Sequence, residues 1–186
     1  MFSKSIKLTD STWFKLQARS MAKEGIEAMT NIRDTNWKVL PWDYANCWNT
    51  FNYDTTCHNN IWTTTDINHN NSYYIFKDNA DYRWKLTSAA TWNYSDVNYR
   101  NRFQVWLDSD WFFTQNWSAT TLKPVFTREI KITYLDDWNT PLNSVANFSN
   151  EEKMQVTSLV QWVDQSSTSV RKVELTTVLT NWRNKK

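Results

Sequence analysis

Residues 18–37 read ARSMAKEGIEAMTNIRDTNW and carry the clearest helical pattern in the chain. Apolar and small side chains recur there at intervals of three and four residues, with charged side chains between them, which is typical of an amphipathic helix. No proline interrupts residues 1–33, and we therefore predict one helix over that range, ending where the polar run 34–36 begins. The expected packing face of this helix consists of Phe14, Ala18, Met21, Ala22, Gly25, Met29 and Ile32.

The length and charge of the chain set broad limits. Its 186 residues suit a single domain, residues 1–186, with a sizeable core. The formal net charge of +2 is small and the two signs are mixed along the chain, so the composition gives no indication of a nucleic-acid partner.

Residues 34–71 are predicted to form a long loop, because they are rich in Asn, Thr and Asp and show no lasting hydrophobic period. Cys47 and Cys57 lie in this loop, and a bond between them would tie it down, so a disulfide is the first expectation. Two free thiols are one alternative. A metal site with His58 and His69 is the other, although the spacing of these four residues does not match a zinc pattern.

Residues 72–186 are predicted to form an antiparallel sheet. Aromatic or alternating runs typical of strands occur at 73–76, 82–86, 102–107 and 126–134, and the polar residues 87–99 are expected to form a loop. The last two runs, 154–162 and 173–179, alternate clearly on either side of a turn, which predicts a C-terminal hairpin. One N-terminal helix followed only by strands indicates the α+β class, with the long amphipathic helix packed on the sheet.

Three segments of the chain are similar to a known family. EGIEAMTNIRDTNW (24–37) closely resembles the end of the first helix in type IV pilin-like proteins of the minor-pilin kind. VTSLVQWVDQSSTSVRKVELTTVLTNWR (156–183) resembles the closing hairpin of bacterial minor pilins, and FTREIKI (126–132) resembles a strand that precedes it. The resemblance implies a membrane-anchored helix whose lower half packs on a sheet, and subunits that bundle through their helices into a filament.

The function implied by this resemblance is structural. The chain is expected to be a subunit, a minor pilin or pseudopilin, of a type IV pilus or related secretion filament at the cell surface, outside the cytoplasm, where disulfides persist. The implied partners are other pilin subunits and the inner membrane. The family opens with a basic leader, a cleavage site and an apolar segment, whereas this sequence opens with MFSKSIKL. We expect those parts to be encoded upstream of Met1, and the chain as given to be soluble.

Catalysis is not expected from the residues present. His58 and His69 lie in a polar loop, where a solvated histidine is far commoner than a catalytic one. Asp108 and Asp110 are predicted to form a turn rather than a carboxylate pair or a calcium loop, since the later ligands of such a loop are missing from the sequence. A chain with one glycine cannot form a glycine-rich phosphate loop. We therefore expect neither an enzyme nor a cofactor.

A second class of function is kept as the alternative. An extracellular carbohydrate-binding or adhesion module would use the many Trp, Tyr and Asn side chains for stacking and hydrogen bonds. Such a module needs no long N-terminal helix, whereas a pilin cannot work without one, so the helix separates the two interpretations.

The glycine and tryptophan counts are abnormal. Average glycine usage is about 7%, yet this chain contains one glycine and 13 tryptophans. Some bacterial lineages read the codon UGA as glycine and others as tryptophan, so a gene of the first kind translated with the second table would exchange glycines for tryptophans. Seven tryptophans follow Pro, Asn or Asp in turn dipeptides or lie in polar loops, and we expect glycine there: Trp42, Trp48, Trp62, Trp92, Trp111, Trp117 and Trp138.

Four other tryptophans are expected to be genuine, because the pilin resemblance or strand alternation favours an aromatic residue there: Trp37, Trp84, Trp162 and Trp182. Trp13 and Trp106 are left unassigned. The suspect side chains should be exposed in turns or held at positive φ, which strains tryptophan but not glycine. Trp84 and Trp162 should be buried. The rival interpretation is a genuinely tryptophan-rich binding surface.

Overall fold

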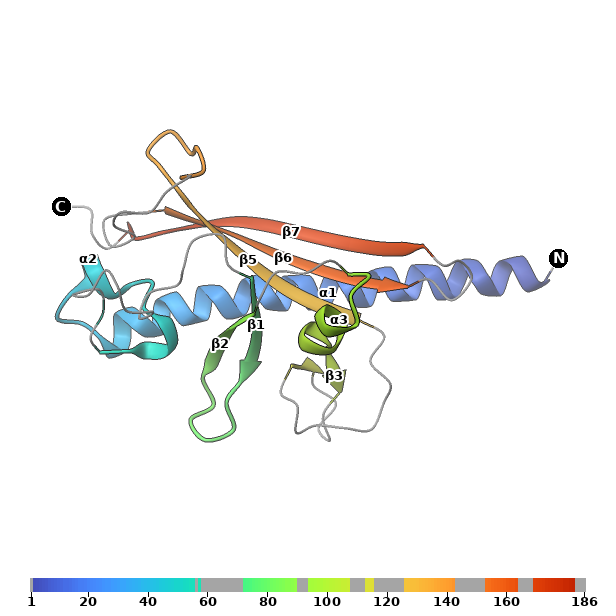
Figure 1. The fold of residues 1–186 in the computed structure, drawn as a ribbon, viewed down its shortest axis with the longest axis horizontal. Helices are drawn as coiled ribbons and strands as arrows, with labels where there is room; N and C mark the ends of the chain where they lie inside the picture. Colours follow the sequence, from blue (N-terminus) through green and yellow to red (C-terminus); the bar gives the residue numbers. More distant parts are fainter. Residues whose placement is uncertain are drawn as a thin grey trace.

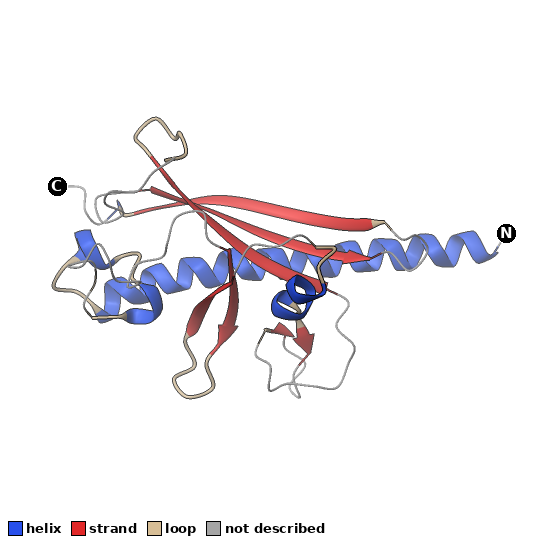
Figure 2. Cartoon of the chain, in the orientation of Figure 1, coloured by secondary structure: helices blue, strands red, loops and turns tan. Residues whose placement is uncertain are grey.

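The computed structural model describes residues 2–55, 57, 72–89, 94–107, 113–115, 126–142, 153–163 and 169–182. One long helix, α1 (Phe2–Val39), runs along a five-stranded antiparallel sheet with the strand order β2-β1-β5-β6-β7 (Figure 1). Figure 2 shows that the N-terminal turns of α1 extend past the end of the strands. The prediction of an α+β chain, with one long N-terminal helix and an antiparallel sheet, is confirmed.

Helix α1 ends at Val39 rather than at residue 33, so the predicted end is wrong. The polar run 34–36 continues the helix because Asn36 turns inward. Its side-chain amide donates hydrogen bonds to the backbone carbonyls of Trp48 at 3.1 Å and Thr50 at 3.0 Å. Pro41, which cannot continue the hydrogen-bond ladder, then excludes further helix.

The predicted loop 34–71 is not structureless over its described part. After α1 the chain forms α2 (Tyr44–Cys47) and the short 3-10 helix η1 (Phe51–Tyr53). Asp43 caps α2, because its carboxylate accepts a hydrogen bond from the backbone N–H of Asn46 at 3.2 Å. Residues 58–71 lie outside the described residues.

The first strand pair is joined to η1. Strands β1 (Ser72–Lys77) and β2 (Trp84–Ala89) are antiparallel, with Ile75 opposite Leu86. The side-chain amide of Asn52 accepts a hydrogen bond from the N–H of Leu86 and donates one to its carbonyl, both at 2.9 Å. Asn52 therefore satisfies these two backbone groups at the edge of β2, as a neighbouring strand would. Positive φ angles at Asn52 (49°) and Tyr53 (63°) turn the backbone toward that edge.

The segment 87–107 differs most from the prediction. Residues 97–103, expected to be loop and the start of a strand, form helix α3 (Val97–Phe103). The Asp96 carboxylate caps this helix by accepting a hydrogen bond from the N–H of Asn98 at 2.7 Å. The buried residues of α3, Tyr99 and Phe103, lie one helical turn apart. Two short strands, β3 (Trp106–Leu107) and β4 (Phe113–Thr114), pair with each other after it.

The three long strands follow the sequence pattern closely. They are β5 (Phe126–Leu135), β6 (Lys153–Val163) and β7 (Val170–Thr180). On β6 every second side chain is buried, from Met154 to Trp162, whereas the matching side chains of β7 stay half-buried until Leu179. The two strands differ because β6 is central in the sheet and β7 is its edge.

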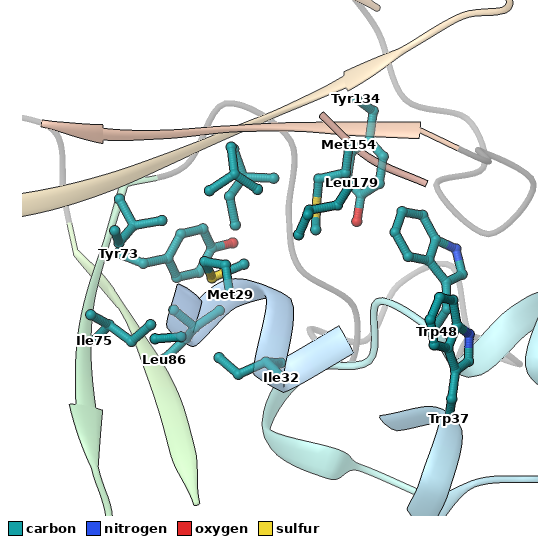
Figure 3. Close-up of a cluster of buried hydrophobic side chains, with 14 residues drawn as sticks. Met29, Ile32, Trp37, Trp48, Tyr73, Ile75, Leu86, Tyr134, Met154 and Leu179 are labelled. Atoms are coloured by element: carbon teal, nitrogen blue, oxygen red, sulfur yellow. The ribbon is translucent and has the colours of Figure 1, made fainter. Parts of the chain in front are cut away.

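The core lies between α1 and the sheet, in two clusters. Figure 3 shows the larger one, where Met29 and Ile32 of α1 lie beside Ile75 and Leu86 of the β1–β2 pair. The smaller cluster packs an earlier part of the helix against β5 and β6, and contains Ala18, Met21, Ala22, Val105, Phe126, Val160 and Trp162. Burial of apolar surface, at about 25 cal/mol per Å², is therefore the main force that holds the helix on the sheet.

Candidate functional site

Helix α1 has one face on the sheet and one face turned away from it. Phe14 is half-buried, and its ring meets that of Phe126 edge-on, with 5.9 Å between centroids. The other residues expected on the packing face are buried: Ala18, Met21, Ala22, Gly25, Met29 and Ile32. The opposite face is exposed and mostly polar, and carries Thr12, Trp13, Lys15, Leu16, Arg19, Ser20, Lys23, Glu27, Asn31, Asp34 and Lys38.

Sequence reasoning missed four buried residues at and after the middle of α1. These are Ala28, Asn36, Trp37 and Leu40. Ala28 lies three residues after Gly25 and four before Ile32, so the same helical period would have found it. Asn36 has no hydrophobic signal, and only its contacts with the following loop reveal why it is buried.

Gly25 marks a close approach of α1 to the sheet. A Cβ atom at this position would lie 2.5 Å from Ser158 Oγ and 2.9 Å from Ile130 Cδ1. Both distances are shorter than real Cβ contacts, so only glycine fits between these neighbours as they stand. Ser158 is buried, and its hydroxyl has no hydrogen-bond partner within the part of the chain that the structure describes.

A buried cation joins α1 to β5. Arg128 is fully buried, and its Nη1 lies 3.0 Å from Glu24 Oε2 on the helix. Nη1 also donates to the carbonyl of Met21 and Nη2 to that of Ile75, each at 3.4 Å. Burial lowers the pKa of the guanidinium, and the Glu24 carboxylate opposes this shift. Because arginine keeps its proton in proteins, the pair is a charged link between helix and sheet.

The side chain of Gln115 fills a gap between β1 and β5. These strands pair through two residues each and then separate. Beyond that point Gln115 Oε1 accepts from the N–H of Ile75 at 3.1 Å, and Nε2 donates to the carbonyl of Arg128 at 2.7 Å. Nε2 also donates to the carbonyl of Phe103 at 2.9 Å. The amide group therefore takes the place of a peptide group between the two strands.

Helix α3 covers the other face of β5. Glu129 follows Arg128 in the strand and so faces away from α1. Its buried carboxylate accepts hydrogen bonds from the hydroxyls of Ser72 and Tyr99. Burial raises the pKa of Tyr99, and the hydrogen bond to Glu129 acts in the same direction. The carboxylate thus links β1, β5 and α3.

The C-terminal end of α1 is clamped by the end of β7. The Trp37 ring meets that of Trp182 edge-on, with 5.1 Å between centroids, and its indole N–H donates to Asn181 Oδ1 at 3.3 Å. Asn181 in turn donates to the carbonyl of Ala45 in α2 at 3.1 Å. Residues 181 and 182, which follow β7, therefore fix this end of the helix, and Asn181 also joins it to α2.

Cys47 and Cys57 lie at disulfide distance, with sulfurs 2.03 Å apart and Cα atoms 5.0 Å apart. This arrangement matches the first of the three expectations for the pair. Within the described ranges, no group of three His, Cys, Asp or Glu side chains is placed to hold a metal ion. The other residues weighed for metal binding or catalysis lie outside the described residues: His58, His69, Asp108 and Asp110.

The turn between β1 and β2 carries an ion-pair cluster. Lys85 Nζ donates to the Asp78 carboxylate and lies 3.2 Å from Asp81 Oδ2. The hydrogen bond from Lys85 lowers the pKa of Asp78, and the same bond raises the pKa of Lys85. The cluster closes the hairpin and lies apart from α1.

Two apolar side chains lie on the exposed face of α1, beside the exposed side chains of Thr12 and Lys15. Trp13 and Leu16 lie three residues apart, hence on one side of the helix, and are 59% and 58% exposed. The residues that follow on this face are polar and mostly charged, and Lys23 pairs with Glu27 at 3.2 Å. Neighbouring exposed apolar side chains on a rigid helix form a candidate docking surface.

The structure corrects one expectation about the suspect tryptophans. Trp42 and Trp138 lie in turns and are exposed, as expected. Trp48 is fully buried in the larger core cluster, so its expected place in a polar loop without a core is wrong. None of these three has a positive φ. The remaining four lie outside the described residues: Trp62, Trp92, Trp111 and Trp117.

The tryptophans expected to be genuine are mostly in contact with the core. Trp37 and Trp162 are buried. Trp84 is half-buried rather than buried, because it lies at the start of β2, the edge strand beside η1. Trp182 is 54% exposed, and its ring meets that of Trp37 edge-on.

Comparison with known proteins finds no family model, no curated protein and no solved structure that matches this chain. Within the described residues, no helix combines the length and the apolar character that a membrane span requires. The feature that distinguishes the molecule is α1, which is fixed at several points on the sheet and exposed along its other face.

Proposed function

We propose that the chain is a structural subunit, a minor pilin or pseudopilin, of a type IV pilus or related secretion filament. The observation that carries the proposal is α1, a 38-residue helix with one face on the sheet and an apolar patch at Trp13 and Leu16 on the other. The resemblance of residues 24–37, 126–132 and 156–183 to pilin-like segments supports the same class. A carbohydrate-binding module would leave this helix without a role.

The anchoring of α1 supports an assembly function. Three contacts hold it along its length: the close approach at Gly25, the pair of Glu24 with Arg128, and the edge-on contact of Trp37 with Trp182. A helix fixed in this way presents its exposed face in one orientation. Such preorganisation lowers the entropy that is lost when subunits associate.

The proposed partners are the corresponding helices of other subunits. Trp13 and Leu16 would be buried between packed helices, where side chains of one helix fit between those of the next. In the full-length protein, α1 is proposed to continue into the inner membrane, with the sheet displayed outside the cytoplasm. A bond between Cys47 and Cys57 would persist in that location.

The test uses cells that carry the complete gene. Filaments are sheared from the surface, and the chain is quantified in them by mass spectrometry for wild type, Leu16→Lys and Val178→Lys. Both residues are apolar and exposed, but Val178 lies on β7, on the sheet face that is turned away from α1. Both variants should therefore unfold at the wild-type temperature.

We expect Leu16→Lys to reduce incorporation into filaments several-fold and Val178→Lys to leave it unchanged. Two results would contradict the proposed function. One is a filament fraction that lacks the wild-type chain although the cells produce it. The other is equal incorporation of the two variants.

A further inference from the structure

The side chain of Trp138 has no part in the turn that contains it. Asp136 organises the turn, because its carboxylate accepts hydrogen bonds from the N–H groups of Trp138 at 2.9 Å and Thr140 at 2.7 Å. Asn139 completes it with a φ of 61°. The indole is 87% exposed and makes no ring contact with any described residue. The turn therefore uses the backbone of residue 138 and not its side chain.

Trp42 is in the same situation at the end of α1. It follows Pro41 in a turn, is 64% exposed, and its ring has no partner among the described residues. Proline favours the first central position of a type I or type II turn, and glycine is common directly after it. Neither position has a positive φ, so tryptophan is not strained there, but here too the local structure makes no use of the indole.

Three other tryptophans fill the core. Trp37, Trp48 and Trp162 are exposed by 5% or less and belong to the two core clusters. Truncating a buried tryptophan leaves a cavity that costs about 3–5 kcal/mol. Glycine at any of these positions would therefore remove a large part of the packing between α1 and the sheet.

We infer that the natural polypeptide carries glycine at positions 42 and 138, and tryptophan at 37, 48 and 162. A gene that uses UGA for glycine, read with a table in which UGA is tryptophan, keeps every UGG tryptophan and adds false ones. Such a reading lowers the glycine count and raises the tryptophan count. This chain has one glycine and 13 tryptophans, whereas glycine makes up about 7% of an average protein. At these five positions burial and turn geometry together sort the two kinds, because residues 42 and 138 are exposed in turns whereas 37, 48 and 162 are buried.

The inference concerns the chemical identity of the chain and does not depend on the proposed function. With glycine at 42 and 138, two of the largest exposed apolar side chains disappear from the surface. The rival interpretation, a tryptophan-rich binding surface, would lose both. Trp48, grouped by its sequence context with the suspects, is assigned here to the genuine tryptophans because of its burial.

The experiment is mass spectrometry of tryptic peptides from the protein isolated from the cells that carry its gene. Peptide 132–153 contains position 138 as its single tryptophan, and the adjacent peptide 154–171 contains Trp162 as its own. We expect the first peptide to have the mass with glycine at 138 and the second to have the mass with tryptophan at 162. The two peptides come from one digest, so each controls the other.

Tryptophan at position 138 in the isolated protein would overturn the inference. Glycine at position 162 would also overturn it, because the buried residues would then not be the genuine ones. The gene provides a second measurement, with UGA expected at codons 42 and 138 and UGG at codons 37, 48 and 162. A UGG codon at 138 would contradict the inference without any protein chemistry.

Discussion

At the residue scale, replacing Gly25 has two opposing effects on stability, one through helix propensity and one through steric overlap with the sheet. Gly25→Ala raises helix propensity by about 1 kcal/mol, but the new methyl group would meet Ser158 Oγ at 2.5 Å and Ile130 Cδ1 at 2.9 Å. Overpacking of a core costs about 1–3 kcal/mol. We therefore predict a lower free energy of unfolding for Gly25→Ala, measured by urea denaturation.

Two further variants isolate the cause. Ser158→Ala removes the nearest atom, and also a buried hydroxyl without a partner among the described residues, so the loss caused by Gly25→Ala should shrink in that background. Ser20→Ala, on the exposed face of α1, reports helix propensity alone. If Gly25→Ala stabilises the chain as Ser20→Ala does, the close approach is not real.

The pair of Glu24 and Arg128 links α1 to β5 by charge. Glu24→Gln leaves the fully buried guanidinium without its carboxylate, and we expect the free energy of unfolding to fall by about 1–3 kcal/mol. The loss stays below that of a fully buried pair because the Glu24 side chain is 30% exposed. Glu27→Gln, which alters the exposed pair with Lys23, should cost less than about 0.5 kcal/mol. Equal losses in the two variants would contradict the link between α1 and β5.

At the scale of elements, Gln115 is predicted to hold β1 against β5. Gln115→Met keeps a similar shape but leaves the N–H of Ile75 and the carbonyl of Arg128 without these hydrogen bonds. Each unsatisfied buried group costs about 1–3 kcal/mol. The amide hydrogen of Ile75 should therefore exchange much faster in this variant. The amides of β6 should still exchange only through global unfolding, as they do in the wild type. Gln155→Met on β6 makes the same chemical change elsewhere and should not affect Ile75. Unchanged exchange at Ile75 in Gln115→Met would contradict the bridging role.

The β1–β2 hairpin should respond to acid through Asp78. Its pKa is lowered in the folded chain by the hydrogen bond from Lys85, so the pair stabilises the hairpin above the usual pKa of Asp. That stabilisation is lost as the pH falls through the lowered folded value. The carboxyl chemical shift of Asp78, followed by NMR, should therefore titrate below the usual range, and the midpoint should rise in Lys85→Met. Identical midpoints in the two proteins would show that Lys85 is not the cause.

Elements with an apolar period could be predicted from the sequence, and those set by polar contacts could not. The packing face of α1 and the strands β5, β6 and β7 repeat an apolar side chain every three to four or every two residues. The structure buries nearly all of these repeats in α1, β5 and β6, whereas those of β7 stay half-buried until Leu179. Helix α3 begins at the Asp96 cap and is too short for a visible period. The end of α1 depends on Asn36, whose bonding partners lie in a later segment.

At the scale of the whole molecule, the sequence predicts one face of α1, the face that packs on the sheet, but not the exposed face. The face of α1 that packs on the sheet follows from its hydrophobic residues. The patch at Trp13 and Leu16 does not, because these residues extend the apolar character of the helix and only the position of the sheet shows that they are left exposed. Burial of Trp48 is a second such case, since Asn46, Asn49 and Thr50 beside it in the sequence are polar.

In the proposed filament, the exposed face of α1 contacts other subunits. The most direct measurement is photo-crosslinking in cells that carry the complete gene, with a photoreactive residue at position 16 or, as the matched control, at position 178. We predict crosslinked products between this chain and other filament subunits from position 16 and none from position 178. Crosslinks from position 178 alone, or from neither position in filaments that contain the chain, would contradict subunit contacts through this face.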